Sequence, residues 1–244
     1  MKTIKLFLVL GLSMIATSSF AQNADEIIAK YFTTIGGADK LKALKGVKMN
    51  MVAKQQGMEF PVEMVQLNGG KMYIKINFQG KEITQMASDG STMWSTNFMT
   101  MKSEKLDSET AENAKLSNQD FPDPLLDYKA KGYAVEYVGK ETKEGAECFK
   151  VKLTKKPVTI SGVKTDDITY YYFDTENYLP IVTETEIKQG PMKGQKSVSK
   201  MSDYQEVDGL FFPYAMNMFG SDLKVTKITL NPTVEDKAFA FPVQ

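Results

Sequence analysis

The chain begins with helical periodicity and then changes to the two-residue period of strands. Apolar residues recur at helical spacing and are followed by a glycine pair, Gly36-Gly37. The apolar positions are Ile27, Ile28, Tyr31, Phe32 and Ile35. This spacing predicts an amphipathic helix that ends at the glycines, followed by a second short helical piece over residues 38–44.

From Val47 onward, apolar and polar residues alternate in a series of short runs. The first runs lie at 47–51, 60–64 and 72–78, with turn signals at Gly57, Asn68–Gly70 and Gly80. Asp89-Gly90 predicts another hairpin turn, and Trp94 lies in the strand that leaves it. Alternation returns at Tyr133 and continues to Leu230. Ten or more short strands in series favour one large curved antiparallel sheet or an incomplete barrel.

Residues 102–132 interrupt this alternation. They are polar and compatible with a helix as far as Asn118, and then read DFPDPLLDYKAKG. Asp123 can cap a helix, Pro124 suits the first helical position and Gly132 can end it. We therefore expect a helical insertion that covers one face of the sheet together with the N-terminal helix.

The first 21 residues have the features of a secretory signal peptide. Lys2 and Lys5 precede the apolar run LFLVLGLSMI, which is too short to span a bilayer, and small residues occupy positions 19 and 21. We expect cleavage after Ala21, with no Cys behind the cut to carry a lipid anchor. The mature chain would be a single domain over 22–244, soluble in the periplasm or secreted. An uncleaved N-terminal anchor is the alternative.

Composition excludes several chemistries. All thirty basic residues are Lys, and the chain has neither Arg nor His. The usual catalytic triads and zinc sites need His, and bidentate grips on phosphate need Arg. No glycine-rich nucleotide-binding motif is present. We expect no enzyme activity, no cofactor, no metal and no nucleic-acid partner; a hydrolase built on a carboxylate pair is the weakest alternative.

Two sulfur-containing residue types add to this picture. Cys148 is the single cysteine, so it forms no intrachain disulfide, and its strand-like surroundings ECFKVKL favour a buried, inert thiol over a catalytic one. Beyond the signal peptide there are thirteen Met, nine of them between Met49 and Met101. Flexible thioethers suit surfaces that adapt to apolar ligands such as acyl chains, with ordinary core packing as the alternative.

Several turn-and-strand motifs occur in an order that resembles the LolA/LolB-like outer-membrane lipoprotein-sorting family. They are SDGSTMW, YFDTENYLPI, DYQEVDGLFFPYAMNM and ITLNPTVEDKAFAFP, and the opening ADEIIAKYFTTIGGADKLKAL is similar to Bacteroidetes-type members. The resemblance implies an unclosed antiparallel barrel of about 10–12 strands, a helical lid over its mouth, and an apolar interior that receives lipid or lipoprotein acyl chains. Carriers of this family hold the lid closed with an interior Arg, which this chain lacks.

The leading hypothesis is a monomeric periplasmic carrier that shelters the acyl chains of a lipid or lipoprotein and exchanges them with envelope transport proteins. The candidate ligand-binding residues are Met49, Met51, Phe60, Val62, Met64, Met72, Ile74, Ile76 and Phe78, with Leu125, Leu126 and Tyr128 as lid contacts. The alternative is an envelope interaction or stress-sensor module of the same fold that carries no lipid. That alternative predicts a filled interior and a sizeable exposed apolar patch.

Overall fold

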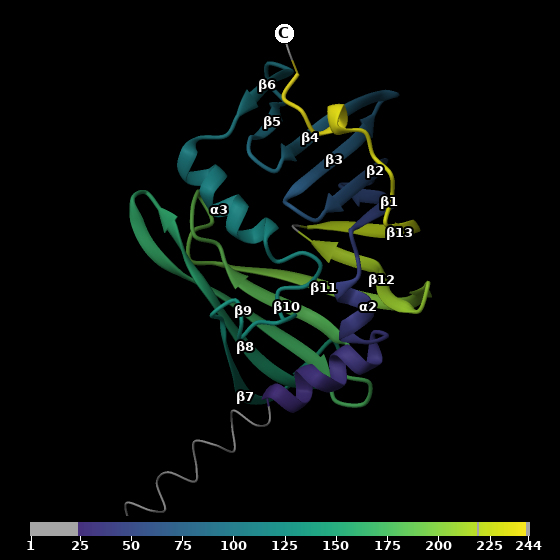
Figure 1. Ribbon diagram of the computed structural model, residues 1–244, viewed down its shortest axis with the longest axis vertical. Helices are drawn as coiled ribbons and strands as arrows, with labels where there is room; N and C mark the ends of the chain where they lie inside the picture. Colours follow the sequence, from purple (N-terminus) through teal and green to yellow (C-terminus); the bar gives the residue numbers. More distant parts are fainter. Residues whose placement is uncertain (1–23, 219, 243–244) are drawn as a thin grey trace, which may run out of the picture.

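The computed structural model describes residues 24–218 and 220–242, and these form one antiparallel sheet with short helices against it (Figure 1). The expected signal peptide and its cleavage site lie outside the described residues. The sheet has thirteen strands in the order β6-β5-β4-β3-β2-β1-β13-β12-β11-β10-β9-β8-β7. Since β6 and β7 are its two edges, the sheet does not close. The predicted unclosed antiparallel architecture is confirmed, with thirteen strands where about ten to twelve were expected.

The strands are connected mostly by tight hairpins, as the alternating pattern predicts. The first six are β1 (Gly46–Gln55), β2 (Met58–Leu67), β3 (Lys71–Phe78), β4 (Lys81–Asp89), β5 (Met93–Asn97) and β6 (Lys102–Lys105). The remaining seven are β7 (Ala134–Lys143), β8 (Ala146–Ile160), β9 (Val163–Asp174), β10 (Pro180–Glu186), β11 (Lys196–Val207), β12 (Leu210–Met218) and β13 (Ser221–Leu230). β1 pairs with β13, so the two ends of the strand series meet in the middle of the sheet.

The helices lie at the N-terminus, in the connection between β6 and β7, and after β13. The predicted N-terminal helix occupies residues 24–34, followed by α2 (Ala38–Lys42). Gly36 separates them at a φ of 108°, and a Cβ built on it would lie 2.0 Å from the carbonyl oxygen of Gly209. A side chain there would therefore push the helices away from the β11–β12 turn. The other two are α3 (Ser108–Asn118) and the short 3₁₀ helix η1 (Asp236–Ala238).

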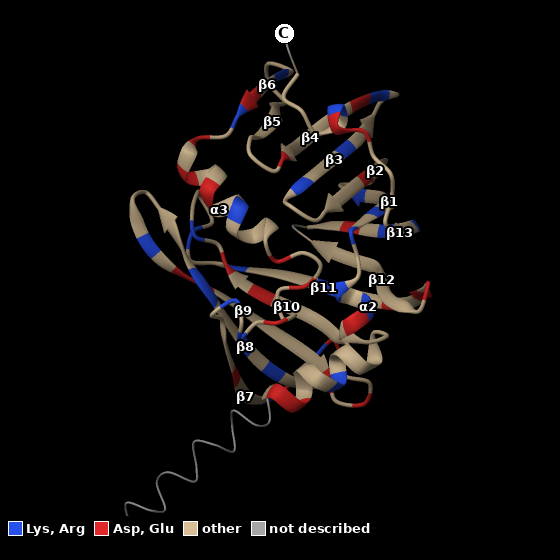
Figure 2. Cartoon of the chain, viewed as in Figure 1, with Lys and Arg blue, Asp and Glu red and all other residues tan. Residues whose placement is uncertain are grey.

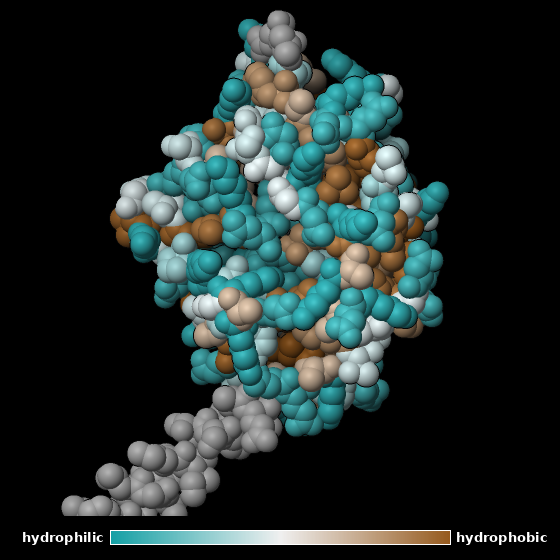
Figure 3. Space-filling model, in the orientation of Figure 1, coloured by the Kyte–Doolittle hydropathy of each residue, from teal (hydrophilic) through white to brown (hydrophobic). Residues whose placement is uncertain are grey.

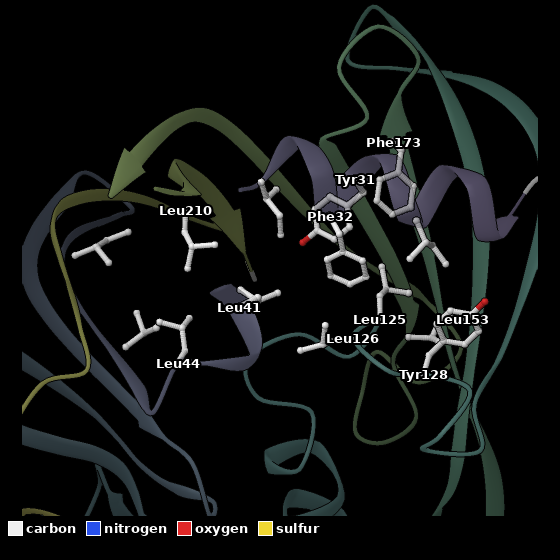
Figure 4. Close-up of a cluster of buried hydrophobic side chains, with 14 of the residues drawn as sticks. Tyr31, Phe32, Leu41, Leu44, Leu125, Leu126, Tyr128, Leu153, Phe173 and Leu210 are labelled. Carbon is white, nitrogen blue, oxygen red and sulfur yellow. The ribbon is translucent and has the colours of Figure 1, made fainter. Parts of the chain in front are cut away.

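The main hydrophobic core lies between the N-terminal helix and the inner, concave face of the sheet (Figure 4). Tyr31 and Phe32 of the helix point toward Leu125 and Leu126, while Phe173 of β9 stands above them. All five predicted apolar positions of the helix are buried, with exposed fractions below 10%. The helix is thus held by its apolar face, which is the usual source of helix stability in proteins.

The outer face of β2–β5 carries a second core, covered by the C-terminal segment. Val65, Tyr73, Ala87 and Trp94 surround Phe239, whose side chain is completely buried. The indole Nε1 of Trp94 donates to the carbonyl oxygen of Phe239 at 3.1 Å. The C-terminal segment therefore packs across β2–β5 and holds them together.

Charged residues of both signs are interspersed along the strands and helices (Figure 2). Many pair across neighbouring strands, as Lys48 does with Glu63 at 2.6 Å. Cys148 is buried, as expected for an inert thiol, and burial raises its pKa. Within the described residues, no helix has the length and apolarity needed to cross a membrane.

The helix predicted from Asp123 is wrong. Asp123 does act as a cap, since its Oδ1 accepts from the backbone N–H of Leu125 at 2.7 Å, but residues 124–132 form successive turns. Asp127 has a φ of 51°, a left-handed conformation that cannot continue a right-handed helix. The helical part of the insertion is α3 instead, where Asp107 caps the backbone N–H of Thr110 at 3.0 Å.

Replacing Phe239 by Ala tests the C-terminal fastening. We expect the free energy of unfolding to fall by about 3–5 kcal/mol, because a fully buried Phe loses its transfer energy and leaves a cavity. Urea denaturation followed by Trp94 fluorescence measures it. Phe98→Ala is the control, since Phe98 is 51% exposed and should change stability by only about 0.5 kcal/mol. Equal effects for the two variants would contradict the packing described.

Replacing Asp123 by Asn tests the partly buried carboxyl group beneath the N-terminal helix. The Asp123 Oδ2 accepts from the Tyr31 hydroxyl at 2.7 Å. Burial raises the pKa of Asp123 above its usual value, although the hydrogen bonds from Tyr31 and Leu125 and the charge of Lys131 lower it. The folded protein therefore holds this proton more tightly than the unfolded chain, and the resulting stability is lost as the pH rises through the folded-state pKa.

We accordingly expect the stability of Asp123→Asn relative to wild type to increase by on the order of 1 kcal/mol between about pH 3.5 and pH 7.5. Urea unfolding at both pH values measures the difference. Asp127→Asn, at an exposed position in the same segment that pairs with Lys42, serves as the control and should show a much smaller change. A relative stability of Asp123→Asn that stays constant with pH would show that the carboxyl group titrates normally.

Candidate apolar binding surface

The strand residues proposed for ligand binding share the inner face of the sheet. Met49 pairs with Met64, and Met64 pairs with Ile74 on the next strand. Met51, Val62 and Ile76 form a second row in the same register. Since residues paired directly across antiparallel strands point to the same side, the two rows make one apolar surface across β1, β2 and β3.

Burial divides this surface into two kinds of residue. Met51 and Val62 are buried in the main core. Five others are only partly buried and pack against that core: Met49, Phe60, Met64, Ile74 and Ile76. Met72 is also partly exposed but lies outside the core cluster, and Phe78 is 38% exposed at the end of β3. The five partly buried residues, defined here as the inner strip, are neither packed solid nor fully open to water.

The three residues proposed as lid contacts are core residues. Leu125, Leu126 and Tyr128 are 1%, 6% and 8% exposed and belong to the same cluster as Tyr31 and Phe32. The Tyr128 hydroxyl also donates to Asp25 of the N-terminal helix. The segment over 120–133 and the helix together fill the inner face over β8 and β9, so the apolar surface still partly accessible lies over β1–β3.

Further partly buried apolar residues on β12 and β13 continue the apolar surface beyond the inner strip. Phe212, Tyr214 and Met216 of β12 and Leu223 of β13 are partly buried apolar residues that pack against the same core. Met216 pairs with Leu223, which places both on one face. The candidate ligand-binding residues predicted from the sequence include none from these strands, although the alternation in LFFPYAMNM indicates an apolar strand face. Only the pairing of β13 with β1 shows that Leu223 lies opposite Ala53, on the same face as Met51.

Helix α3 is tied to two separate parts of the sheet by polar contacts alone. Glu109 accepts from the backbone N–H groups of Ser161 and Gly162 at 2.7 and 2.8 Å, at the tip of the β8–β9 hairpin. Asn113 both donates to and accepts from the backbone of Thr159, at 2.6 and 2.9 Å. At its other end Asn118 lies 3.4 Å from the carbonyl oxygen of Gly70. No side chain of α3 is buried, so the helix is a strap held by hydrogen bonds.

A chain of ion pairs fixes the segment that follows α3. Asp120, only 7% exposed, lies 3.1 Å from Lys155 of β8, and Lys155 lies 2.9 Å from Asp167 of β9. Burial lowers the pKa of Lys155, but the two carboxylates outweigh it, so the pKa is raised and the ammonium stays charged. Tyr133 donates to Asp120 at 2.8 Å. These groups are mutually satisfied, which makes them a structural network.

A wide groove lies on the opposite, outer face. It has a volume of about 970 Å³ and runs over β1 and β11–β13 to the β7–β8 turn. Val52, Lys224 and Ala215 pair in register along its floor, which places them on the face opposite the inner strip. Lys54, Lys200 and several carboxylates surround it. In the described part of the chain, no cluster of acidic and cysteine side chains is arranged to hold a metal ion.

Apolar side chains also show on the molecular surface. In Figure 3 they gather in separate patches between polar residues, over the strands at the right of the view and at the hairpin that projects on the left. The projecting hairpin joins β8 and β9, where Val163 is 64% exposed. The face seen in this view is therefore mostly polar, with separate apolar patches.

Solved structures with the same architecture exist, although no family model and no curated protein sequence matches the chain. A DUF1329 family protein from Desulfovibrio piger is 14% identical with a TM-score of 0.53, over 89% of this chain and 97% of that one. A LolA superfamily protein from Nitrosomonas europaea is 15% identical with a TM-score of 0.53, again over 89% and 97%. The chain therefore has the fold of the LolA superfamily, as the order of its sequence motifs predicts.

Proposed function

We propose that this protein is an exported carrier that binds the acyl chains of a lipid or lipoprotein against the inner strip. One observation carries the proposal. Met49, Met64 and Ile74 form a row of adaptable apolar side chains that is continuous with the core yet partly open. The LolA-type fold supports it, because one of the proteins that share this fold belongs to a superfamily named for lipoprotein sorting. The signal-like N-terminus agrees with a periplasmic location.

Apolar burial supplies the binding energy. Each methylene group removed from water contributes about 0.8 kcal/mol, so even a partly covered chain of ten carbons gains several kcal/mol. Met side chains can change rotamer to follow chains of different shape. A carrier of this kind selects by length and bulk of the apolar part, while the headgroup or peptide stays in water.

Access to the strip is controlled by α3 in this proposal. The strap is fastened to the β8–β9 hairpin by Glu109 and Asn113 and buries no apolar side chain there. Hydrogen bonds of this exposed kind contribute on the order of 1 kcal/mol each, so the strap can part without unfolding the core. Such a strap would provide a gate in a chain that contains no Arg.

A second candidate function is an envelope interaction module without lipid. It is favoured by the filled inner face over β8 and β9, where Leu125, Leu126 and Tyr128 leave no space for a ligand. In that case the outer groove or the exposed hairpins would contact a protein partner. The lipid test below separates the two functions.

Charged substitutions on the inner strip test the carrier function. Met64→Glu and Ile74→Glu should each lower acyl-chain binding at least tenfold, because a carboxylate in the row must be desolvated when the chain binds. The measurement is native mass spectrometry of protein from a periplasmic extract, with lipid identification after organic extraction. Titration with a fluorescent fatty acid gives the affinity.

The matched control is Val163→Glu, which adds the same charge at a position that is 64% exposed and lies at the start of β9, outside the strip. Met49→Thr is the milder second variant if a glutamate prevents folding, as judged by circular dichroism. A wild-type protein that carries no lipid and takes up no fatty acid would reject the carrier function in favour of the interaction module.

A further inference from the structure

Three neighbouring hairpins present large apolar side chains at one end of the sheet. The β1–β2, β3–β4 and β5–β6 hairpins all turn at the same end, because β1 to β6 lie side by side in antiparallel order (Figure 1). Their exposed residues are Met58 (51%), Phe78 (38%), Phe98 (51%), Met99 (96%) and Met101 (44%). Half of the exposed large hydrophobic residues among the described positions thus belong to these three hairpins, which we call the apolar tips.

Hydrogen bonds within the β5–β6 tip hold its backbone in the conformation that exposes Phe98 and Met99. Asn97 accepts from the backbone N–H groups of Met99 and Thr100 at 3.0 and 3.3 Å, and the N–H of Met101 reaches the carbonyl oxygen of Asn97 at 2.7 Å. These bonds close the β5–β6 loop with Phe98 and Met99 on its outside. Met99 is 96% exposed, so its apolar side chain gains free energy when a partner removes it from water.

The charges near the tips favour an anionic partner surface. The carboxylates of Glu59 and Glu82 lie 3.7 and 2.8 Å from Lys54 and Lys75, so each is paired. Glu104 accepts from Asn97 at 3.0 Å. Lys81 and Lys102 flank the second and third tips directly. The tips therefore combine apolar ends with flanking lysines, and the carboxylates nearest to them are paired or hydrogen-bonded.

We propose that the apolar tips dock the protein on a phospholipid bilayer by inserting into its interfacial layer. Three separate protrusions offer no flat area for a protein partner to pack on, whereas a fluid lipid surface can close around each one. Lysines that extend their ammonium groups toward lipid phosphates add electrostatic attraction at an anionic surface. The overall charge of the chain is balanced, so attraction would arise only at contact.

The tips are continuous with the inner strip, which gives docking a purpose under the proposed carrier function. Phe60 belongs to the strip, and Phe78 lies two residues beyond Ile76 on the same face of β3. Apolar side chains therefore extend from the bilayer edge to Met64 and Ile74. Docking would place the entrance to the strip at the membrane, so that an acyl chain moves between them without crossing water. This part of the inference rests on the proposed function.

Vesicle flotation with the mature protein tests the docking. The vesicles contain phosphatidylethanolamine and phosphatidylglycerol at about three to one. We expect the double variant Phe98→Ser/Met99→Ser to lose at least tenfold in vesicle binding. The matched control is Val163→Ser/Met192→Ser, which removes two other exposed side chains, 64% and 52% exposed, and should bind like wild type.

A fluorescent label adds a local readout that does not depend on affinity. Cys148 is completely buried, so a Met99→Cys variant can be labelled selectively at position 99 with an environment-sensitive dye. The dye emission should shift to the blue on adding vesicles, whereas the same dye on Met192→Cys should not shift. Met64→Glu should still bind vesicles, which separates failure of docking from failure of lipid carriage.

Three outcomes would overturn the docking. Wild-type protein that does not float with vesicles rejects it, as does equal loss in the control double variant. A dimer seen by size-exclusion chromatography that disappears in Phe98→Ser/Met99→Ser, without vesicle binding, would assign the tips to self-association instead.

Discussion

The structure depends on the burial of the N-terminal helix in the concave face of the sheet. The thirteen strands form a single layer, which cannot bury the apolar side chains of its own inner face. Another part of the chain must therefore pack against that face. The helix supplies Tyr31 and Phe32, and the segment after α3 supplies Leu125 and Leu126. Without this filling, the inner faces of β8 and β9 would be open to water. The helix can pack there because Gly36 has no side chain, which allows its backbone to approach that of Gly209 closely.

The filling is uneven, and the unevenness gives the molecule its candidate site. Over β8 and β9 the inner face is packed, whereas over β1 to β3 and β12 the side chains are only partly covered. The outer face shows the reverse, since the C-terminal segment covers β2–β5 around Phe239 while a groove of about 970 Å³ opens over β11–β13. The sheet therefore has one covered and one accessible region on each face. Only the inner accessible region is lined by a continuous row of Met and Ile side chains.

Hydrogen bonds and ion pairs hold α3 and the segment over 120–133 against the sheet. Asp120, Lys155 and Asp167 anchor the insertion from inside, and Glu109 and Asn113 anchor α3 from outside. The inner ties are shielded and costly to separate, since parting them would leave a buried charge without a partner. The outer ties are hydrogen bonds, exposed at Glu109 and partly buried at Asn113. They hold α3 less firmly than the ion pairs hold the segment over 120–133.

The sequence by itself determined the unclosed antiparallel sheet, the N-terminal helix with its buried positions, the buried cysteine and the LolA-type fold. Each depends on local periodicity, turn residues or the order of motifs, which short segments carry in full. The tertiary structure decided that the Asp123 segment forms turns, because Asp127 takes a left-handed conformation that cap residues cannot reveal. It also decided that Leu125, Leu126 and Tyr128 are core, and that Leu223, with Met216 beside it, lies opposite Ala53 of β1. The last of these facts depends on the pairing of β13 with β1, whose paired residues lie 168 to 183 positions apart in sequence, and no local pattern encodes a contact over that separation.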